Sequence, residues 1–100
     1  MSSHKSCLTL SPEAQKDFIG ILRYTGERWG REQLLAYRDK LNDALMLIGN
    51  NPLLGHQSAE PADTHRLHFV GSHVIVDRTR ADASEVIRIL HQRMSISRNL

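Results

Sequence analysis

The chain has 100 residues, of which 40% are hydrophobic and 24% charged, a globular composition that excludes disorder and fibrous architectures. This length fits one small domain and excludes two, since single domains typically run to about 100 to 150 residues. Thirteen Lys and Arg residues against eleven Asp and Glu residues give a net charge of +2. Such a weak field excludes a protein that binds DNA strongly by itself.

The single cysteine, Cys7, can form neither an internal disulfide nor a multi-cysteine zinc site, and a free thiol suits a reducing compartment. No run approaches the ~18 apolar residues of a membrane span. Residues 1–7 form a polar leader without the apolar segment of a signal peptide. We therefore expect a cytoplasmic protein with no membrane partner, whose single domain spans residues 8–100.

The first predicted elements are a short strand and a helix. Residues 7–10 alternate as a strand does, and Ser11-Pro12-Glu13 then supplies an N-cap, a proline at the first helical position and an acid in the first turn. Apolar residues recur at helical spacing from Ala14 to Trp29. Gly30 supplies the left-handed stop, so the first helix is predicted over 12–29.

A second helix is predicted by apolar residues that recur at helical spacing from Leu34 to Ile48, and Gly49 is expected to end it. Because so few residues separate two amphipathic helices, we expect them to double back as a helical hairpin. Residues 52–64 are rich in turn-forming residues and have no sustained period, which indicates an exposed loop.

Three β-rich runs follow, at residues 66–70, 73–78 and 85–91. Gly71-Ser72 is a two-residue hairpin connection, and residues 79–83 form a second turn, so the runs are predicted to make a β-meander. The element order β-α-α-β-β-β indicates an α+β fold of two layers, in which the helical hairpin packs on an antiparallel sheet.

The run 73–78 is predicted to have two chemically different faces. Val74 and Val76 point to one face, whereas His73, Ile75 and Asp77 point to the other. We interpret the second, mixed face as the one away from the helices, and as a docking surface.

Catalytic and cofactor chemistry has little support in the sequence. His65 and His68 lie three apart in a predicted strand and so point to opposite faces, and no carboxylate or thiol completes a set of metal ligands. A G-x-S-x-G elbow and the phosphate-binding glycine motifs are both missing from the sequence. We therefore predict no metal, no cofactor and no nucleophilic catalytic residue.

The C-terminal segment 88–100 is locally basic, with three arginines, one histidine and no acidic residue. Together with three arginines of the neighbouring strands, this segment could bind RNA, DNA or an acidic protein surface. The alternative is a solvated strand edge whose charged side chains prevent pairing with another strand. The three arginines are Arg66, Arg78 and Arg80.

Cleavage of RNA without a metal would need an acid or base, cations and an aromatic ring to stack a base. Histidine at position 68, 73 or 91 and arginine at position 66, 78 or 93 would supply the first two. The ring is missing, because the aromatic residues are interpreted as core. They are Phe18, Tyr24, Trp29 and Tyr37 on the helices and Phe69 in the sheet.

Five short segments follow one another along the chain: Leu10-Ser11-Pro12-Glu13-Ala14, Tyr24-Thr25-Gly26-Glu27-Arg28-Trp29-Gly30, Asn51-Pro52-Leu53-Leu54-Gly55, Val70-Gly71-Ser72-His73-Val74-Ile75 and Ile89-Leu90-His91-Gln92-Arg93-Met94. Together they resemble the RelE/ParE superfamily of bacterial toxins, and they favour its ParE branch. The resemblance covers about residues 8–100 without large gaps, and the predicted element order agrees with the fold of that superfamily.

The resemblance implies the toxin of a bacterial type II toxin-antitoxin system. A ParD-like antitoxin would neutralise it in a hetero-oligomeric complex, and operator DNA would be bound only through the antitoxin. ParE members poison DNA gyrase by binding, so no enzymatic activity is expected. The toxicity residues implied are Arg88, His91, Arg93 and Met94. The antitoxin is expected to contact His73, Ile75, Asp77 and Arg78.

The alternative is a ribosome-dependent mRNA endonuclease similar to RelE. Such an enzyme usually carries a tyrosine or another catalytic residue near the last strand, and in this chain His91 alone could take that place.

Overall fold

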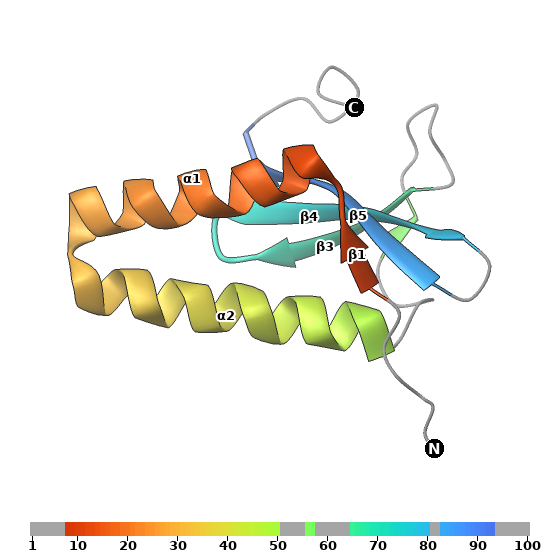
Figure 1. The fold of residues 1–100 in the computed structure, drawn as a ribbon, viewed down its shortest axis with the longest axis horizontal. Coiled ribbons are helices and arrows are strands. Elements are labelled where there is room, and N and C mark those ends of the chain that lie inside the picture. The colour runs from red at the N-terminus through yellow and green to blue at the C-terminus, as the bar shows by residue number, and fades with distance from the viewer. Residues whose placement is uncertain (1–7, 51–55, 58–64, 81–82, 94–100) are drawn as a thin grey trace.

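The computed structural model describes residues 8–50, 56–57, 65–80 and 83–93, so the expectations for Cys7, Met94 and the tail after it lie outside the described residues. Two helices pack on one face of a sheet (Figure 1). The closed end of the helical hairpin extends past the turn between β3 and β4. The elements are β1 (Leu8–Leu10), α1 (Pro12–Trp29), α2 (Arg31–Asn50), β2 (His56–Gln57), β3 (His65–Val70), β4 (His73–Arg80) and β5 (Ala83–His91).

Local chemistry determines both ends of α1, as predicted. The Ser11 Oγ atom accepts a hydrogen bond from the Ala14 N–H at 3.0 Å, and Pro12 opens the helix. At the other end Gly30 has a φ of +96°, and its N–H donates to the Gly26 carbonyl at 2.9 Å.

The end of α2 differs from the prediction. Gly49 does not stop the helix, which continues to Asn50 with Gly49 buried. A glycine inside a helix costs about 1 kcal/mol relative to alanine. The preceding turn of α2 places Leu45 and Ile48 in the core, and this packing outweighs the local preference of glycine.

The sheet has the strand order β1-β5-β4-β3-β2. Strands β2, β3, β4 and β5 pair antiparallel, whereas β1 runs parallel to β5, so the sheet is mixed. The α+β fold class is confirmed. Three details differ from the prediction: β1 pairs parallel in a sheet that was predicted to be antiparallel, the two-residue strand β2 lies inside the expected loop, and β4 and β5 extend into the expected turn at 79–83.

The central strand β4 is buried on both faces, and the predicted assignment of its faces is wrong. Ile75 and Asp77 are both 0% exposed, and Ile75 belongs to the cluster beneath the helices. Val74 and Val76 are instead buried in a second cluster on the opposite face. Alternation along a strand separates two sets of side chains, but it does not say which set faces the helices. The helix-facing cluster is Ala14, Leu45, Ile48, Ile75, Val86 and Ile89.

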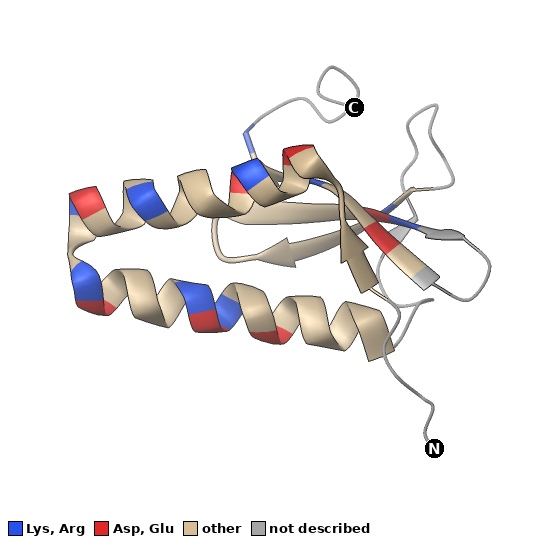
Figure 2. Ribbon diagram, viewed as in Figure 1, with Lys and Arg blue, Asp and Glu red and all other residues tan. Residues whose placement is uncertain are grey.

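Charged side chains of both signs are interspersed along the helical hairpin (Figure 2). At the start of α2, for example, Arg31 is followed directly by Glu32. No helix in the described part of the chain is long and apolar enough to cross a membrane.

Candidate functional site

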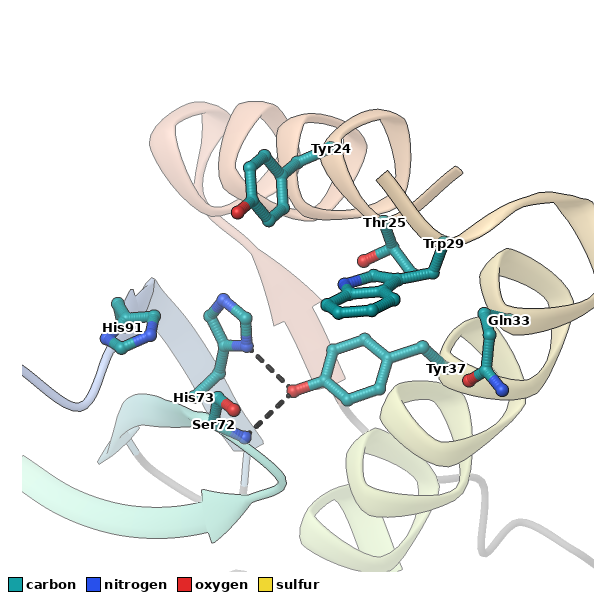
Figure 3. A pocket seen from close by; sticks show the side chains of 8 residues that line it. All are labelled: Tyr24, Thr25, Trp29, Gln33, Tyr37, Ser72, His73 and His91. Atoms are coloured by element: carbon teal, nitrogen blue, oxygen red, sulfur yellow. Dashed lines mark hydrogen bonds between the residues drawn. The ribbon is translucent and has the colours of Figure 1, made fainter. Parts of the chain in front are cut away.

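A pocket of about 570 Å³ opens where the tip of the helical hairpin meets the end of the sheet (Figure 3). Both helices, the turn between β3 and β4, and the last residue of β5 contribute to it. Of the described residues that line it, none is Lys, Arg, Asp or Glu. The lining residues are Tyr24, Thr25, Trp29, Gln33, Tyr37, Ser72, His73 and His91.

Tyr37 joins α2 to the end of the sheet. Its hydroxyl oxygen accepts a hydrogen bond from the Ser72 N–H at 3.2 Å and lies 2.7 Å from His73 Nδ1 (Figure 3). The Val70 carbonyl, at 3.2 Å, is a second acceptor for the hydroxyl proton. Burial raises the pKa of Tyr37, so the hydroxyl keeps its proton at neutral pH.

The turn beneath Tyr37 requires glycine. Gly71 has a φ of +56°, and a Cβ atom at this position would lie 2.6 Å from the Tyr37 hydroxyl oxygen. The glycine that the sequence indicated as a hairpin signal therefore also allows the close approach of Tyr37.

His73 and His91 face each other across β4 and β5. They are paired in the strand register, and their rings meet edge to face with centroids 5.4 Å apart. Burial lowers the pKa of His73, and the charge of His91 lowers it further, so the His73 imidazole is neutral at pH 7. On its other side His73 lies against the Tyr37 ring, at a centroid distance of 5.6 Å.

The outer walls of the pocket are exposed aromatic rings, and their interpretation as core is wrong. Tyr24 is 60% exposed and Trp29 is 63% exposed. Phe69, on β3, is also largely exposed. Trp29 continues the apolar stripe of α1, but the stripe runs past the sheet, so most of the Trp29 side chain stays exposed. Tyr24 lies off this stripe, which was the signal in the sequence that it is not core.

Comparison with known proteins decides the family. The family of ParE toxins of type II toxin-antitoxin systems, parDE, matches residues 8–96. The chain belongs to the ParE toxin family. The resemblance seen in the sequence is therefore confirmed, and membership of a parDE system implies a ParD antitoxin as partner.

The matches to individual relatives span nearly the whole chain. The chain is 36% identical to Toxin ParE1 of Mycobacterium tuberculosis over 92 residues, which cover 91% of this chain and 94% of the relative. It is 33% identical to Toxin ParE1 of Caulobacter vibrioides over 91 residues, with the same coverage. A solved structure described as the chromosomal ParDE TA system from P. aeruginosa has the same fold, with a TM-score of 0.75 at 18% identity over 89% of this chain and 98% of that one.

The predicted toxicity residues of this ParE family member occupy different environments. Arg88 is mostly buried, and its guanidinium binds both carboxylate oxygens of Asp17, at 2.8 and 3.1 Å. This hydrogen bonding to Asp17 is the main reason that the pKa of Arg88 is raised. Arg88 thus joins β5 to α1, whereas His91 and Arg93 are exposed at the end of β5. The Arg93 N–H donates to His91 Nδ1 at 3.1 Å.

The predicted antitoxin residues are also divided. Ile75 and Asp77 are buried and cannot contact a partner, and Asp77 Oδ1 lies 2.8 Å from His68 Nε2. Arg78 is partly exposed and pairs with Glu85, with a distance of 3.2 Å between Nε and Oε1. His73 lines the pocket.

The structure therefore brings together His73 and His91, which the sequence had assigned to different partners. Sequence reasoning missed the other six lining residues as site residues: Tyr24, Thr25, Trp29, Gln33, Tyr37 and Ser72. Among the described residues, no group of three or more His, Cys, Asp or Glu side chains could hold a metal ion.

Proposed function

We propose that this ParE toxin inhibits DNA gyrase by binding to it, and that the ParD antitoxin neutralises the toxin by covering its exposed apolar side chains. The observation that carries binding rather than catalysis is the chemistry of the pocket. Its described lining holds two imidazoles and no Lys or Arg. RNA cleavage needs cations close to the phosphate that reacts, because negative charge accumulates there in the transition state.

The target surface in this proposal is the exposed end of β5. His91 and Arg93 lie there, and Met94 follows directly in the sequence. Arg88 is not part of this surface, since Asp17 holds its guanidinium. A cationic and polar strand end is suited to an acidic patch on a protein target.

The antitoxin surface in this proposal includes the helical hairpin, His73 and Arg78. Ile19 on α1 and Met46 and Leu47 on α2 are each more than half exposed. Burying such a side chain fully stabilises a complex by about 1.5 to 3 kcal/mol before ordering costs. A disordered antitoxin segment that covers several of them could therefore bind tightly. Operator DNA would be bound through the antitoxin.

The decisive experiment is to induce the chain in a bacterium with and without its antitoxin. We expect growth arrest with an SOS response and intact messages when the antitoxin is absent, and purified toxin should inhibit supercoiling by gyrase. Arg93→Glu should reduce both effects, whereas Arg23→Glu, the same charge change on an exposed part of α1, should not. Deleting residues 93–100 should abolish growth arrest and leave antitoxin binding intact. Growth arrest without DNA damage would contradict the proposal.

Cleavage of mRNA is the second candidate, because His73 and His91 lie side by side with aromatic rings next to them. It predicts codon-phased cuts in messages, and it predicts that His91→Ala abolishes toxicity without weakening antitoxin binding. The gyrase proposal predicts instead that messages stay intact, and that His91→Ala weakens gyrase inhibition only partly, since His91 supplies one contact and transfers no proton.

A further inference from the structure

We propose that the pocket binds an unpaired nucleobase by stacking, either the base of a free nucleotide or a base of a single-stranded nucleic acid. The inference is independent of gyrase inhibition. Five of the eight lining residues carry flat rings: Tyr24, Trp29, Tyr37, His73 and His91. These rings come from α1, α2, β4 and β5 and surround a common space (Figure 3). Flat rings facing one space favour a planar ligand.

The exposure of the rings supports a ligand that stacks. Tyr24 and Trp29 stay largely open to solvent although they line a concave site. Tyr37 and His73 are held in place beneath them by the hydrogen bond between the hydroxyl and Nδ1. A base that enters this space would meet a fixed floor and exposed walls, and aromatic side chains stack on any base because every base has a π-face.

The charge distribution indicates which part of a nucleotide would enter. None of the described lining residues is Lys, Arg, Asp or Glu, so the pocket itself offers no charge to a phosphate. A cation stands beside one wall of the pocket instead, because the Arg28 guanidinium lies 5.5 Å from the centre of the Trp29 ring. This arrangement places the base inside and a phosphate outside, on the side of Arg28.

The size and polarity of the pocket also fit a base better than one side chain of a protein partner. A volume of about 570 Å³ lies within the range of roughly 300 to 1,000 Å³ typical of small-molecule sites. Gln33 and Ser72 add an amide and a hydroxyl to the lining. Such groups can read the hydrogen-bonding edge of a base, whereas an aliphatic or phenyl side chain has no such edge.

The test uses the full-length toxin and its own fluorescence. Trp29 is the only tryptophan in the chain, so its emission reports directly on the pocket. Excitation at the red edge of tryptophan absorption avoids absorption by the nucleotides. The probes are adenosine, AMP, a short oligoadenylate, the duplex of that oligonucleotide and N-acetyl-tyrosinamide, which stands for an aromatic side chain of a protein and is not excited at this wavelength.

We expect saturable quenching by adenosine and AMP with similar affinities, because the phosphate stays outside, and no saturable quenching by the duplex, whose bases are paired. If the oligoadenylate binds at least tenfold more tightly than AMP and loses this advantage in high salt, the bound base belongs to a single-stranded nucleic acid. If the oligoadenylate binds no more tightly than AMP, the bound base belongs to a free nucleotide. The proposal is overturned if no nucleotide quenches saturably, or if N-acetyl-tyrosinamide binds as tightly as adenosine.

Substitutions on α1 test whether the ligand binds in the pocket or elsewhere on this helix. Tyr24→Ala should weaken binding of AMP roughly fivefold or more, and Tyr24→Phe should retain it, since the ring and not the hydroxyl stacks. Ile19→Ala is the matched control, because Ile19 is similarly exposed on the same helix but does not line the pocket. Equal loss in Tyr24→Ala and Ile19→Ala would place the ligand elsewhere and overturn the proposal.

Discussion

The two ends of the helical hairpin are built on the same amphipathic pattern, but they differ in what lies beneath them. The start of α1 and the end of α2 cover the sheet, and Ala14 and Ile48 are almost fully buried there. The closed end extends past the sheet, and Trp29, which continues the stripe of α1 there, remains more than half exposed. An apolar stripe therefore becomes core only where a second layer reaches it, and the remainder becomes a pocket.

The largest expected effect is at the covered end. Ile75→Ala should lower the free energy of unfolding by about 2 to 5 kcal/mol, because Ile75 is fully buried between the helices and the sheet. Urea unfolding followed by circular dichroism measures this. A loss below about 1 kcal/mol would contradict the placement of Ile75 beneath the helices.

Breaking the contact between α1 and β5 should cause the second-largest loss in the free energy of unfolding. Asp17 binds the Arg88 guanidinium, and its Oδ2 atom also accepts the Ile89 N–H at 2.9 Å. Asp17→Ala leaves both donors without this acceptor, and we expect a loss of about 1 to 3 kcal/mol in the same unfolding experiment. Asp39→Ala is the control, since the pair of Asp39 with Arg38 is exposed and should contribute less than about 1 kcal/mol.

At the border between the two ends, Tyr37→Phe keeps the ring and removes the hydroxyl. The Ser72 N–H and His73 Nδ1 both lose a partner, so we expect a loss of about 0.5 to 1.5 kcal/mol. Tyr24→Phe provides the comparison, because no shift in stability is expected from the exposed ring. Equal losses in the two variants would argue against the role of Tyr37 in holding the turn.

The pH dependence of stability should identify His73. Its pKa in the folded state is lower than the ordinary value of 6.5, so the unfolded chain binds more protons as the pH falls below 6.5. This contribution to stability is therefore fully present above 6.5 and decreases as the pH falls through the window down to the lowered pKa. His73→Gln should flatten the unfolding free energy in this window, and a steeper dependence in the variant would contradict the assignment.

The smallest effect should come from the open end. Trp29→Ala should change the free energy of unfolding by less than about 0.5 kcal/mol, because the ring is largely exposed and contributes little to the core. Thermal unfolding of the variant beside Ile75→Ala would show the contrast directly. A loss as large as that of Ile75→Ala would mean that the two ends do not differ.

Local signals in the sequence predicted the features that depend on neighbours along the chain. Ser11 and Gly30 bound α1, and Gly71-Ser72 forms the turn between β3 and β4. The face of β4 that meets the helices could not be predicted, because both faces of this central strand are buried and each contributes to a hydrophobic cluster. Gly49 failed as a stop because tertiary packing outweighs a weak local preference.

The pocket depends on contacts that no local pattern records. His73 was singled out in the sequence, but its neighbour His91 comes from a different strand, and their approach follows from the register of β4 against β5. Tyr37 reaches the same place from α2, more than 30 positions earlier, where spacing alone indicates only a helix face. The family, in contrast, was accessible from the sequence because its motifs extend along the whole domain.

The short outer strands of the sheet have a consequence for the toxin in the absence of its partner. At one edge β1 has three residues, and at the other β2 has two. Beyond the end of β1, the Ser11 N–H donates to the Val86 carbonyl and the Ser11 hydroxyl donates to the Ile87 carbonyl. The Asp17 carboxylate accepts a hydrogen bond from the Ile89 N–H. These hydrogen bonds occupy backbone groups at the β1 edge of the described sheet, so we expect this edge of free toxin to resist pairing with a further strand.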